Sequence, residues 1–397
     1  MTQAEPVTAL PGSGAEAGQS RNLESEPLGD DPAEQLANGN EDVEGLGSEP
    51  GSWGNYPLDE LLIRNEVRTI YEVIRRIGQK DRYIMNPDFQ RDFIWSPEKQ
   101  SKLIKSVIMR IPLPVFYLAE DSQGRMIVVD GLQRLSTFQR FLNNQLKLKL
   151  PYQNSLNGNH FVDLPIKLQN RIEDCNLIFY LIDAKVPEAT RLDIFERVND
   201  SVPLTRQQMR NCLYMGKGTR FLKEESKSQI FLEATGKRLN SKIMRDREFV
   251  NRFCAFQLLD RDSYRADMDK FLTDCLKKMN GMEETELSEL SEQLRKSLEN
   301  NFILFGKHAF RKHKANQDKR RPVNASLWDV MSTGLSYYAT DHVQAHAEPL
   351  CQAIDRILAD QDFDAAITLG TNSVKKVMLR FEKAQQTIEE VLGAHTA

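Results

Sequence analysis

Cysteine is sparse in this 397-residue chain, and the few cysteines present form no framework. All five are widely scattered, and no C-x-x-C pair occurs. This spacing argues against a disulfide scaffold or a zinc ribbon and favours buried free thiols in a reducing compartment. The chain also has no run of 18 uncharged apolar residues, so no membrane span is expected. Its first residues lack the basic start and apolar block of a secretory signal. We therefore expect a cytoplasmic protein.

The common motifs of nucleotide and metal enzymes are missing as well. There is no G-x-x-x-x-G-K-[ST] loop, no G-x-S-x-G elbow and no dinucleotide fingerprint. Among six histidines, His342 and His346 have i, i+4 spacing, but no glutamate follows His342 as H-E-x-x-H requires. We expect these histidines to lie on the surface. Any cleavage of nucleic acid would then come from the front of the chain or from a separate partner.

The net charge of −4 conceals an uneven distribution. Residues 1–50 contain eleven acidic residues and one base, whereas the remaining residues contain 52 Lys and Arg against 46 Asp and Glu. The body of the protein is therefore mildly basic, which permits binding to nucleic acid. Residues 1–55 are rich in Gly, Ser, Glu, Pro and Ala and have few bulky apolar groups, which predicts a disordered acidic tail. Such a tail is either simply solvated or competes with nucleic-acid phosphates for the basic body.

The apolar periodicity divides the rest of the chain into a mixed front and a helical rear. The expected front elements are a helix over 58–77, an extended piece over 83–87, a helix from Ser96-Pro97 to near Arg110, strands over 115–118 and 126–129 that form a hairpin, a helix over 133–142 and a strand over 177–182. From about residue 188 the pattern is almost wholly helical. We predict an α+β fold with a mixed α/β domain over 56–187 and an α-helical domain over 188–397.

The sharpest chemical feature is the sequence Val128-Val129-Asp130-Gly131-Leu132-Gln133-Arg134. It predicts a strand that turns at Gly131 into a helix, whose first backbone N–H groups and dipole favour an anion. Arg134 offers a planar set of donors suited to phosphate oxygens, and Gln133 could orient a phosphate or a water molecule. Asp130 could hold Mg²⁺ or fix the arginine. Taken alone, the pattern fits equally well an N-terminal capping aspartate beside an exposed arginine.

Two further segments could contribute to the same site. Gln90 and Arg91 follow Asn86-Pro87 in a loop just before the Ser96-Pro97 helix start. Arg197 and Asn199 lie in Phe195-Glu196-Arg197-Val198-Asn199, where the apolar residues are expected to face the core. The alternative is that Asn199 merely ends a helix.

Together these motifs resemble the N-terminal domain of GmrSD-type restriction enzymes, which are directed against modified DNA. The matching segments, in order, are Phe89-Gln90-Arg91, Trp95, Ile111-Pro112-Leu113-Pro114, Asp130-Gly131-Leu132-Gln133-Arg134, Phe195-Glu196-Arg197-Val198-Asn199, Pro203-Leu204 and Met209-Arg210-Asn211. The resemblance covers roughly residues 60–215 and implies a ParB/sulfiredoxin-like fold that binds nucleotide phosphates. Its common signature is Asp-Gly-Gln-Gln-Arg, so Leu132 replaces the first glutamine here. If that glutamine contacts nucleotide or water, hydrolysis would be weaker in this chain.

The resemblance implies a nucleotide-binding and nucleotide-hydrolysing protein that acts on DNA in anti-phage defence. Asp130, Gln133 and Arg134 would be the catalytic residues, and Mg²⁺ bound at Asp130 would neutralise charge on a nucleoside triphosphate. The residues that would complete the nucleotide site are Gln90, Arg91, Gly131, Arg197 and Asn199. One alternative is a non-catalytic ParB-like module that uses nucleotide as a switch. Another is a metal-dependent nicking enzyme that uses Asp88, Asp92 and Asp130. A separate nuclease or defence protein would be a further partner.

The densest positive stretch of the chain lies in the helical rear. Its cations, apart from His313, are Arg311, Lys312, Lys314, Lys319, Arg320 and Arg321. Such a cluster could neutralise several phosphates and make DNA binding depend steeply on salt. The alternative is a solvated loop between helices.

Overall fold

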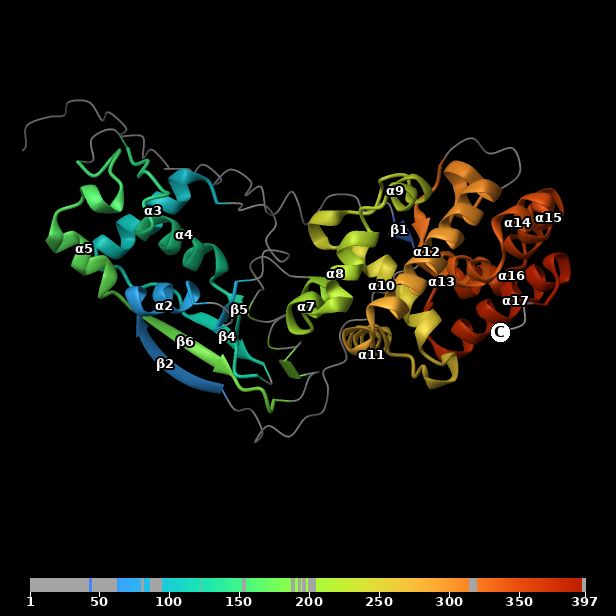
Figure 1. Ribbon diagram of the computed structural model, residues 1–397, viewed down its shortest axis with the longest axis horizontal. Coiled ribbons are helices and arrows are strands. Elements are labelled where there is room, and N and C mark those ends of the chain that lie inside the picture. Colours follow the sequence, from blue (N-terminus) through green and yellow to red (C-terminus); the bar gives the residue numbers. More distant parts are fainter. Residues whose placement is uncertain are drawn as a thin grey trace, which may run out of the picture. The chain divides into compact units, whose positions relative to one another are not determined.

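The computed structural model describes residues 43–44, 63–79, 82–85, 95–121, 123–151, 155–186, 190–191, 194, 198, 205–313 and 320–394 (Figure 1). It confirms the predicted α+β fold, with a small sheet near the front and helices behind it. Within the described ranges, no helix is both long enough and apolar enough to cross a bilayer.

The front of the chain is built on a five-stranded mixed sheet with the order β2-β6-β4-β5-β3. The strands are β2 (Ile63–Thr69), β3 (Tyr83–Ile84), β4 (Phe116–Glu120), β5 (Met126–Asp130) and β6 (Asn176–Ile182). The predicted hairpin is confirmed, because β4 and β5 are antiparallel neighbours. The pairs β6–β4 and β3–β5 are parallel, and β2–β6 is antiparallel.

Alternating side chains give the sheet two buried faces. Phe116, Leu118 and Val128 point to one face, where four helices cover them (Figure 1). These helices are α2 (Ile70–Ile77), α3 (Pro97–Ile108), α4 (Leu132–Leu142) and α5 (Ile166–Glu173). The other face contributes Ala119, Ile127, Val129 and Ile182 to a smaller cluster, which Met209 and Cys212 of α7 (Arg206–Leu213) complete. The sheet is therefore a layer between two cores, and α7, expected among the rear helices, packs on it.

The prediction of one helix over 58–77 is wrong from Ile63 to Thr69, and residues 58–62 lie outside the described residues. Every residue from Ile63 to Thr69 pairs with β6, so this segment is strand β2. The helix α2 begins only at Ile70, where the Thr69 hydroxyl accepts a hydrogen bond from the Glu72 N–H at 3.2 Å. Gly78 is the C-cap of this helix. A second helix start is confirmed at Ser96, whose hydroxyl accepts from the Lys99 N–H, with Pro97 in the first turn.

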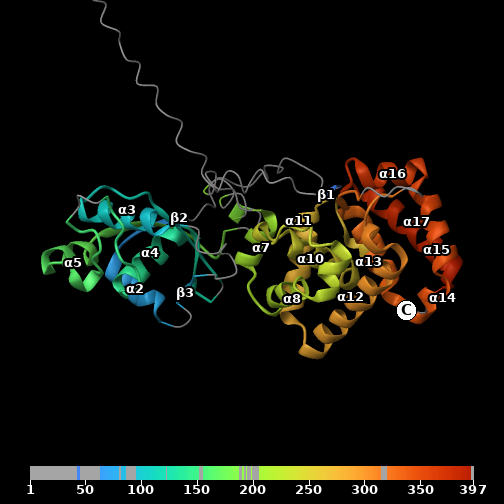
Figure 2. The ribbon, with the colours of Figure 1, turned by 90° about the horizontal axis from the view of Figure 1, so that it is seen from above.

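The rear of the chain is helical, as predicted. Its α-helices are α8 (Lys217–Glu225), α9 (Gln229–Thr235), α10 (Arg245–Leu258), α11 (Met268–Gly281), α12 (Glu284–Phe305), α13 (Ala325–Gly334), α14 (Thr340–Ala345), α15 (Ala347–Leu358), α16 (Gln361–Thr368) and α17 (Val374–Leu392). Helix α13 lies against both α10 and α12 (Figures 1 and 2). Its Trp328 is fully buried, contacts the rings of Phe231, Phe249 and Phe310, and donates its indole N–H to the Phe249 carbonyl at 2.7 Å. This apolar cluster is the centre of the rear core.

A buried charge cluster lies beside Trp328. Asp329 accepts two hydrogen bonds from Arg252, at 2.8 and 2.6 Å, and one from Arg380 at 2.9 Å. All three side chains are at most 2% exposed. The carboxylate thus ties α10, α13 and α17 together, and removing it would leave two buried guanidinium groups without their anion.

The prediction that residues 1–55 are disordered throughout is wrong at Val43 and Glu44. These two residues form strand β1, which pairs in parallel with β7 (Val323–Asn324), and Val43 packs against the rear core. The apolar contact of Val43 with the rear core stabilises this short strand. The acidic residues around Val43 gave no sign of this contact in the sequence. The rest of the predicted tail lies outside the described residues.

Candidate functional site

The turn after β5 has the backbone that the sequence predicts. Strand β5 ends at Asp130, Gly131 adopts a left-handed conformation with φ of 98°, and α4 begins at Leu132. A Cβ atom at Gly131 would lie 2.2 Å from Cδ1 of Phe116, so a larger residue would meet both strain and overlap. The β4–β5 register shifts between Tyr117 and Leu118, just before this turn. Such irregularities bend a strand and change the direction in which the chain leaves it.

The N-terminus of α4 is suited to an anion. Its N-cap, Gly131, provides no side-chain hydrogen bond to the first turn. The first N–H groups of a helix have no partner within the helix, and its dipole places partial positive charge there. No acidic residue occupies the first turn of α4. The local charge therefore favours a phosphate or carboxylate at this point.

Gln133 has a side-chain oxygen that makes no hydrogen bond. Its Oε1 atom is buried and has no hydrogen-bond partner. Burying an amide oxygen without a partner costs about 1–3 kcal/mol, so this arrangement favours an occupant that donates a hydrogen bond. Because the oxygen and nitrogen of an amide can exchange places by a flip, the same position can also donate to a phosphate. The role that the sequence predicts for Gln133, to orient a phosphate or a water molecule, stays a prediction.

Arg134 departs from the expected arrangement, because its guanidinium points into the protein. Nη1 donates to the Pro114 carbonyl, and Nη2 donates to the Val115 carbonyl at 2.9 Å and to Asp130 Oδ2 at 2.8 Å. The group also lies 4.1 Å from the centre of the Phe116 ring, and the residue is only 8% exposed. Burial lowers the pKa of Arg134, and Asp130 opposes that effect. The guanidinium fixes the turn to the segment before β4, which corrects the expectation of an open phosphate-gripping arginine.

Asp130 has the second of its two predicted roles. Its carboxylate forms an ion pair with Arg134, while its side chain stays 39% exposed at the mouth of the turn. Across the described part of the chain, no group of three or more His, Cys, Asp or Glu residues could hold a metal ion. Asp130 could supply one carboxylate ligand to a Mg²⁺ ion at this turn.

Leu132, which replaces a glutamine of the common signature, packs against the core cluster beneath the sheet. Its side chain is thus used for packing. The remaining predicted nucleotide-site residues, and two of the proposed metal ligands, lie outside the described residues; they are Gln90, Arg91, Arg197, Asn199, Asp88 and Asp92.

Helix α7 carries a buried polar network that the sequence did not indicate as such. Arg210 is 1% exposed, donates through Nε to Gln207 at 3.0 Å, and forms a 2.5 Å ion pair with Asp269 of α11. Gln207 also donates to Asn211 at 2.8 Å. The Met209-Arg210-Asn211 motif thus joins the sheet to the helical rear. Its only sequence signal was its place among the matching motifs.

The basic stretch of the rear is partly committed to internal contacts. Arg311 is 1% exposed and donates to the carbonyls of Ala309 and Thr235, so its assignment to DNA binding is wrong for this fold. Lys312 forms a 2.6 Å ion pair with Asp364. Arg320 donates weakly to the Thr235 carbonyl at 3.4 Å and fills the space beside Gly236. Arg321 is half-buried, and Lys314 and Lys319 lie outside the described residues.

The front of the chain is similar to a known family of domains. Residues 70–215 match the family model of the GmrSD restriction endonuclease, N-terminal domain. The matched span begins with α2 and ends two residues after α7, so it contains the Gly131 turn and the helix that packs on the sheet. No curated protein and no solved structure matches the chain.

Proposed function

We propose that the front of the chain, whose residues 70–215 match the model of the GmrSD restriction endonuclease N-terminal domain, belongs to that family and that the protein acts on DNA in a restriction or defence system. We further propose that the Gly131 turn binds the phosphates of a nucleoside triphosphate. One observation carries this assignment: the uncapped N-terminus of α4 lies beside a buried Gln133 oxygen that has no partner. The ParB-like character of the domain belongs to the same proposal.

In this proposal the backbone makes the main phosphate contacts. The first N–H groups of α4 donate to phosphate oxygens, and Gly131 allows the close approach. Arg134 is a positioning residue, because it holds β5 and α4 against the Pro114–Val115 segment. Gln133 orients a phosphate oxygen or the attacking water molecule. Gln90, Arg91, Arg197 and Asn199 complete the nucleotide site by resemblance to the family.

A Mg²⁺ ion at this turn could arrive with the nucleotide. Asp130 would supply one carboxylate, already paired with Arg134, and the ion would neutralise charge on the phosphates. Among the residues that the structure describes, no group of three or more His, Cys, Asp or Glu side chains could form a metal-dependent nicking centre. We favour nucleotide chemistry at this turn because of the uncapped helix start and the unpaired Gln133 oxygen, and we propose a separate nuclease or defence partner for any DNA cleavage.

A non-catalytic nucleotide switch is the second candidate, and two observations favour it. Asp130 is engaged with Arg134, and Leu132 stands where relatives have a glutamine that could contact nucleotide or water. Both features reduce the side chains available for hydrolysis and leave the phosphate-binding backbone intact. The two candidates therefore share a binding site and differ in turnover.

Calorimetric titration with ATP, GTP and CTP tests the shared binding site. Gln133→Glu would place a negative charge at the phosphates, and we expect it to weaken binding at least tenfold. Gln139→Glu, two turns further along α4, is the matched control and should bind like wild type. Equal affinities for the two variants would reject the site.

Phosphate release with and without DNA separates the two candidates. Hydrolysis requires steady release of phosphate that Gln133→Ala lowers at least tenfold, whereas a switch binds triphosphate without releasing it. Conversion of supercoiled plasmid to its nicked form, measured with Mg²⁺ and no nucleotide, addresses direct cleavage by this chain. Nicking under those conditions would overturn the assignment of cleavage to a partner.

A further inference from the structure

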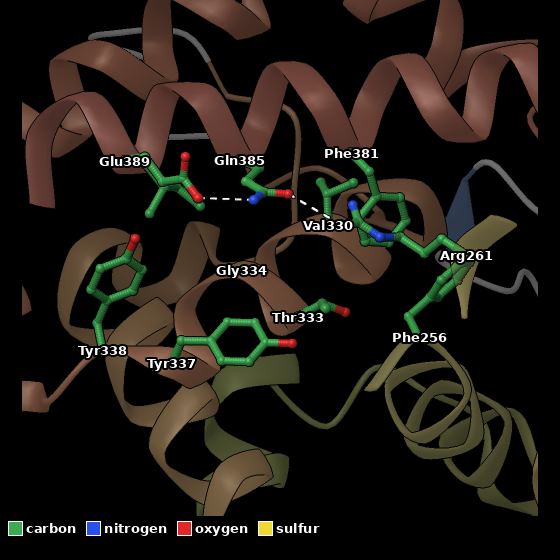
Figure 3. A pocket seen from close by; sticks show the side chains of 11 residues that line it. Phe256, Arg261, Val330, Thr333, Gly334, Tyr337, Tyr338, Phe381, Gln385 and Glu389 are labelled. Atoms are coloured by element: carbon green, nitrogen blue, oxygen red, sulfur yellow. Dashed lines mark hydrogen bonds between the residues drawn. The ribbon is translucent and has the colours of Figure 1, made fainter. Parts of the chain in front are cut away.

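A pocket opens in the helical rear, among elements that do not include the Gly131 turn. It lies between α10, α13 and α17, and the short helices η4 (Arg261–Ser263) and η6 (Leu335–Tyr337) close its sides (Figure 3). The space between these elements, counted together with the open solvent at its mouth, is about 470 Å³.

Aromatic rings form much of the pocket wall. Phe256 and Phe381 pack against each other with ring centres 4.6 Å apart. Tyr337 is 42% exposed, and Figure 3 shows its ring on the opposite side of the space from the α17 side chains. Its hydroxyl donates to Gln257 Oε1 at 3.0 Å, which holds the ring in place. A fixed aromatic surface of this kind suits a planar ligand.

A line of polar groups runs along the side of the pocket that α17 forms. Arg261 donates to Gln385 Oε1 at 3.2 Å, and Gln385 donates through Nε2 to Glu389 at 2.8 Å (Figure 3). The Arg261 guanidinium also lies 5.1 Å from the centre of the Phe381 ring. One positive and one negative charge balance here. The lining therefore suits a neutral ligand with both donors and acceptors better than a phosphate.

Thr333 has a buried hydroxyl that makes no hydrogen bond. The residue lines the pocket and is 6% exposed, yet its Oγ1 atom is buried with no hydrogen-bond partner. Valine at this position would fill the same space without the cost of an unpaired hydroxyl. A ligand that bonds to this hydroxyl would account for it.

We propose that this pocket binds a nucleobase, as a planar nitrogen heterocycle whose face stacks on Tyr337 and whose edge bonds to Thr333, Gln385 and Glu389. Rigid rings, an amide, a carboxylate and a hydroxyl are the groups that recognise the face and edge of a base. The base could come from a free nucleotide or from a nucleotide turned out of DNA, and both present the same chemistry. This site is separate from the proposed phosphate site.

Titration of the full chain with adenosine, guanosine, cytidine and thymidine tests the proposal, because these nucleosides carry no phosphate. Ribose 5-phosphate, which has no base, is the control ligand. We expect at least one nucleoside to bind and ribose 5-phosphate not to compete with it. Tyr337→Ala should weaken nucleoside binding about tenfold or more by removing the stacking surface. Tyr71→Ala, a change to an exposed tyrosine on α2, should have no effect.

Thr333→Val separates a role in binding from a role in folding. Replacing an unpaired buried hydroxyl with a methyl group should leave the melting temperature unchanged or raise it. Nucleoside affinity should nevertheless fall about threefold to tenfold. Gln133→Glu should leave nucleoside affinity unchanged, so failure of the phosphate site and failure of this pocket give different results.

A DNA duplex containing 2-aminopurine, a base whose fluorescence increases when it is unstacked, identifies the source. An increase that a nucleoside competes away and Tyr337→Ala abolishes assigns the pocket to a base from DNA. Nucleoside binding without that increase assigns it to a free nucleotide. The proposal is overturned if none of the four nucleosides binds, or if Tyr337→Ala and Tyr71→Ala have the same affinity.

Discussion

Replacing Arg134 with alanine tests whether its side chain holds the turn together or grips a ligand. The guanidinium donates to the carbonyls of Pro114 and Val115 and lies over the Phe116 ring. Each buried carbonyl left without a donor costs about 1–3 kcal/mol, and loss of the cation–π contact costs about 1 kcal/mol. The ion pair adds little, because Asp130 is 39% exposed and water can solvate it. We therefore expect the free energy of unfolding to fall by about 4 kcal/mol.

Arg125 provides a matched control on the same sheet. It forms an ion pair with Asp121, also four residues away, but its side chain is 35% exposed. Arg125→Ala should therefore cost about 1 kcal/mol or less. Arg134→Lys should fall between the two alanine variants, because lysine keeps the charge but not the planar set of donors.

Urea denaturation followed by circular dichroism gives the stability of each variant. Hydrogen–deuterium exchange of peptides that cover β4 and α4 then locates the change. In Arg134→Ala these peptides should exchange faster, while those from the helical rear keep their wild-type rates. Suppose instead that Arg134→Ala and Arg125→Ala unfold at the same urea concentration, and only Arg134→Ala loses nucleotide affinity tenfold. The arginine would then contact the ligand directly, and its positioning role would be wrong.

Four further perturbations test individual contacts. Gly131→Ala should lower the free energy of unfolding, measured by thermal melts, by about 3 kcal/mol, because the backbone would be strained and the added methyl would overlap Phe116. Gly124→Ala should lower it by about 1 kcal/mol, because the added methyl has room there. Asp329→Asn should lower the free energy of unfolding by about 3–5 kcal/mol, because two buried guanidinium groups would lose their anion. As a control, Asp274→Asn, which breaks an exposed ion pair, should lower it by less than about 1 kcal/mol. Burial raises the pKa of Tyr264 to about 12. The neutral Tyr264 side chain therefore stabilises the fold fully below about pH 10, and this stabilisation is lost as the pH rises towards 12. A Tyr264→Phe variant should lose less stability over this range than wild type, and an equal loss would contradict the raised pKa. Arg321→Glu should reduce the slope of log affinity for DNA against log salt by about 1, and an unchanged slope, as expected for Lys270→Glu, would exclude Arg321 from the DNA contact.

Local pattern predicted much of the front sheet, but it could not predict which strands are neighbours. The alternation at Phe116, Leu118 and Val128 shows which side chains share a face. The order β2-β6-β4-β5-β3 depends on pairing between segments up to 119 residues apart, such as Ile63 with Ile182. Nothing within either segment encodes that pairing. The same limit explains the error at β2, where helical spacing before Ile70 gave way to seven residues of pairing with β6.

The site illustrates a different limit of sequence reasoning. Residue types and spacing predicted the Gly131 turn and the position of Gln133, but not the direction of the Arg134 side chain. Asp130 and Arg134 are four residues apart, which is the spacing of an ion pair on a helix, and this signal supported the internal pairing equally well. The rear pocket had no such signal. Thr333, Tyr337 and Gln385 come from three elements, and only the folded chain brings them together.

The geometry around the turn bears differently on binding and on hydrolysis. Binding needs a helix start that is open to an anion, and Gly131 provides it without any side chain. Hydrolysis needs side chains that can act on water or phosphate. Three side chains of the turn already make internal contacts. Asp130 pairs with Arg134, Arg134 also donates to the carbonyls of Pro114 and Val115, and Leu132 packs in the core. Gln133 keeps a buried polar atom that has no hydrogen-bond partner. If the turn hydrolyses a triphosphate as proposed, we expect this amide to contribute mainly to turnover and the backbone to contribute most of the affinity. Gln133→Ala should accordingly lower turnover much more than affinity, and equal losses in both would mean that the amide only binds.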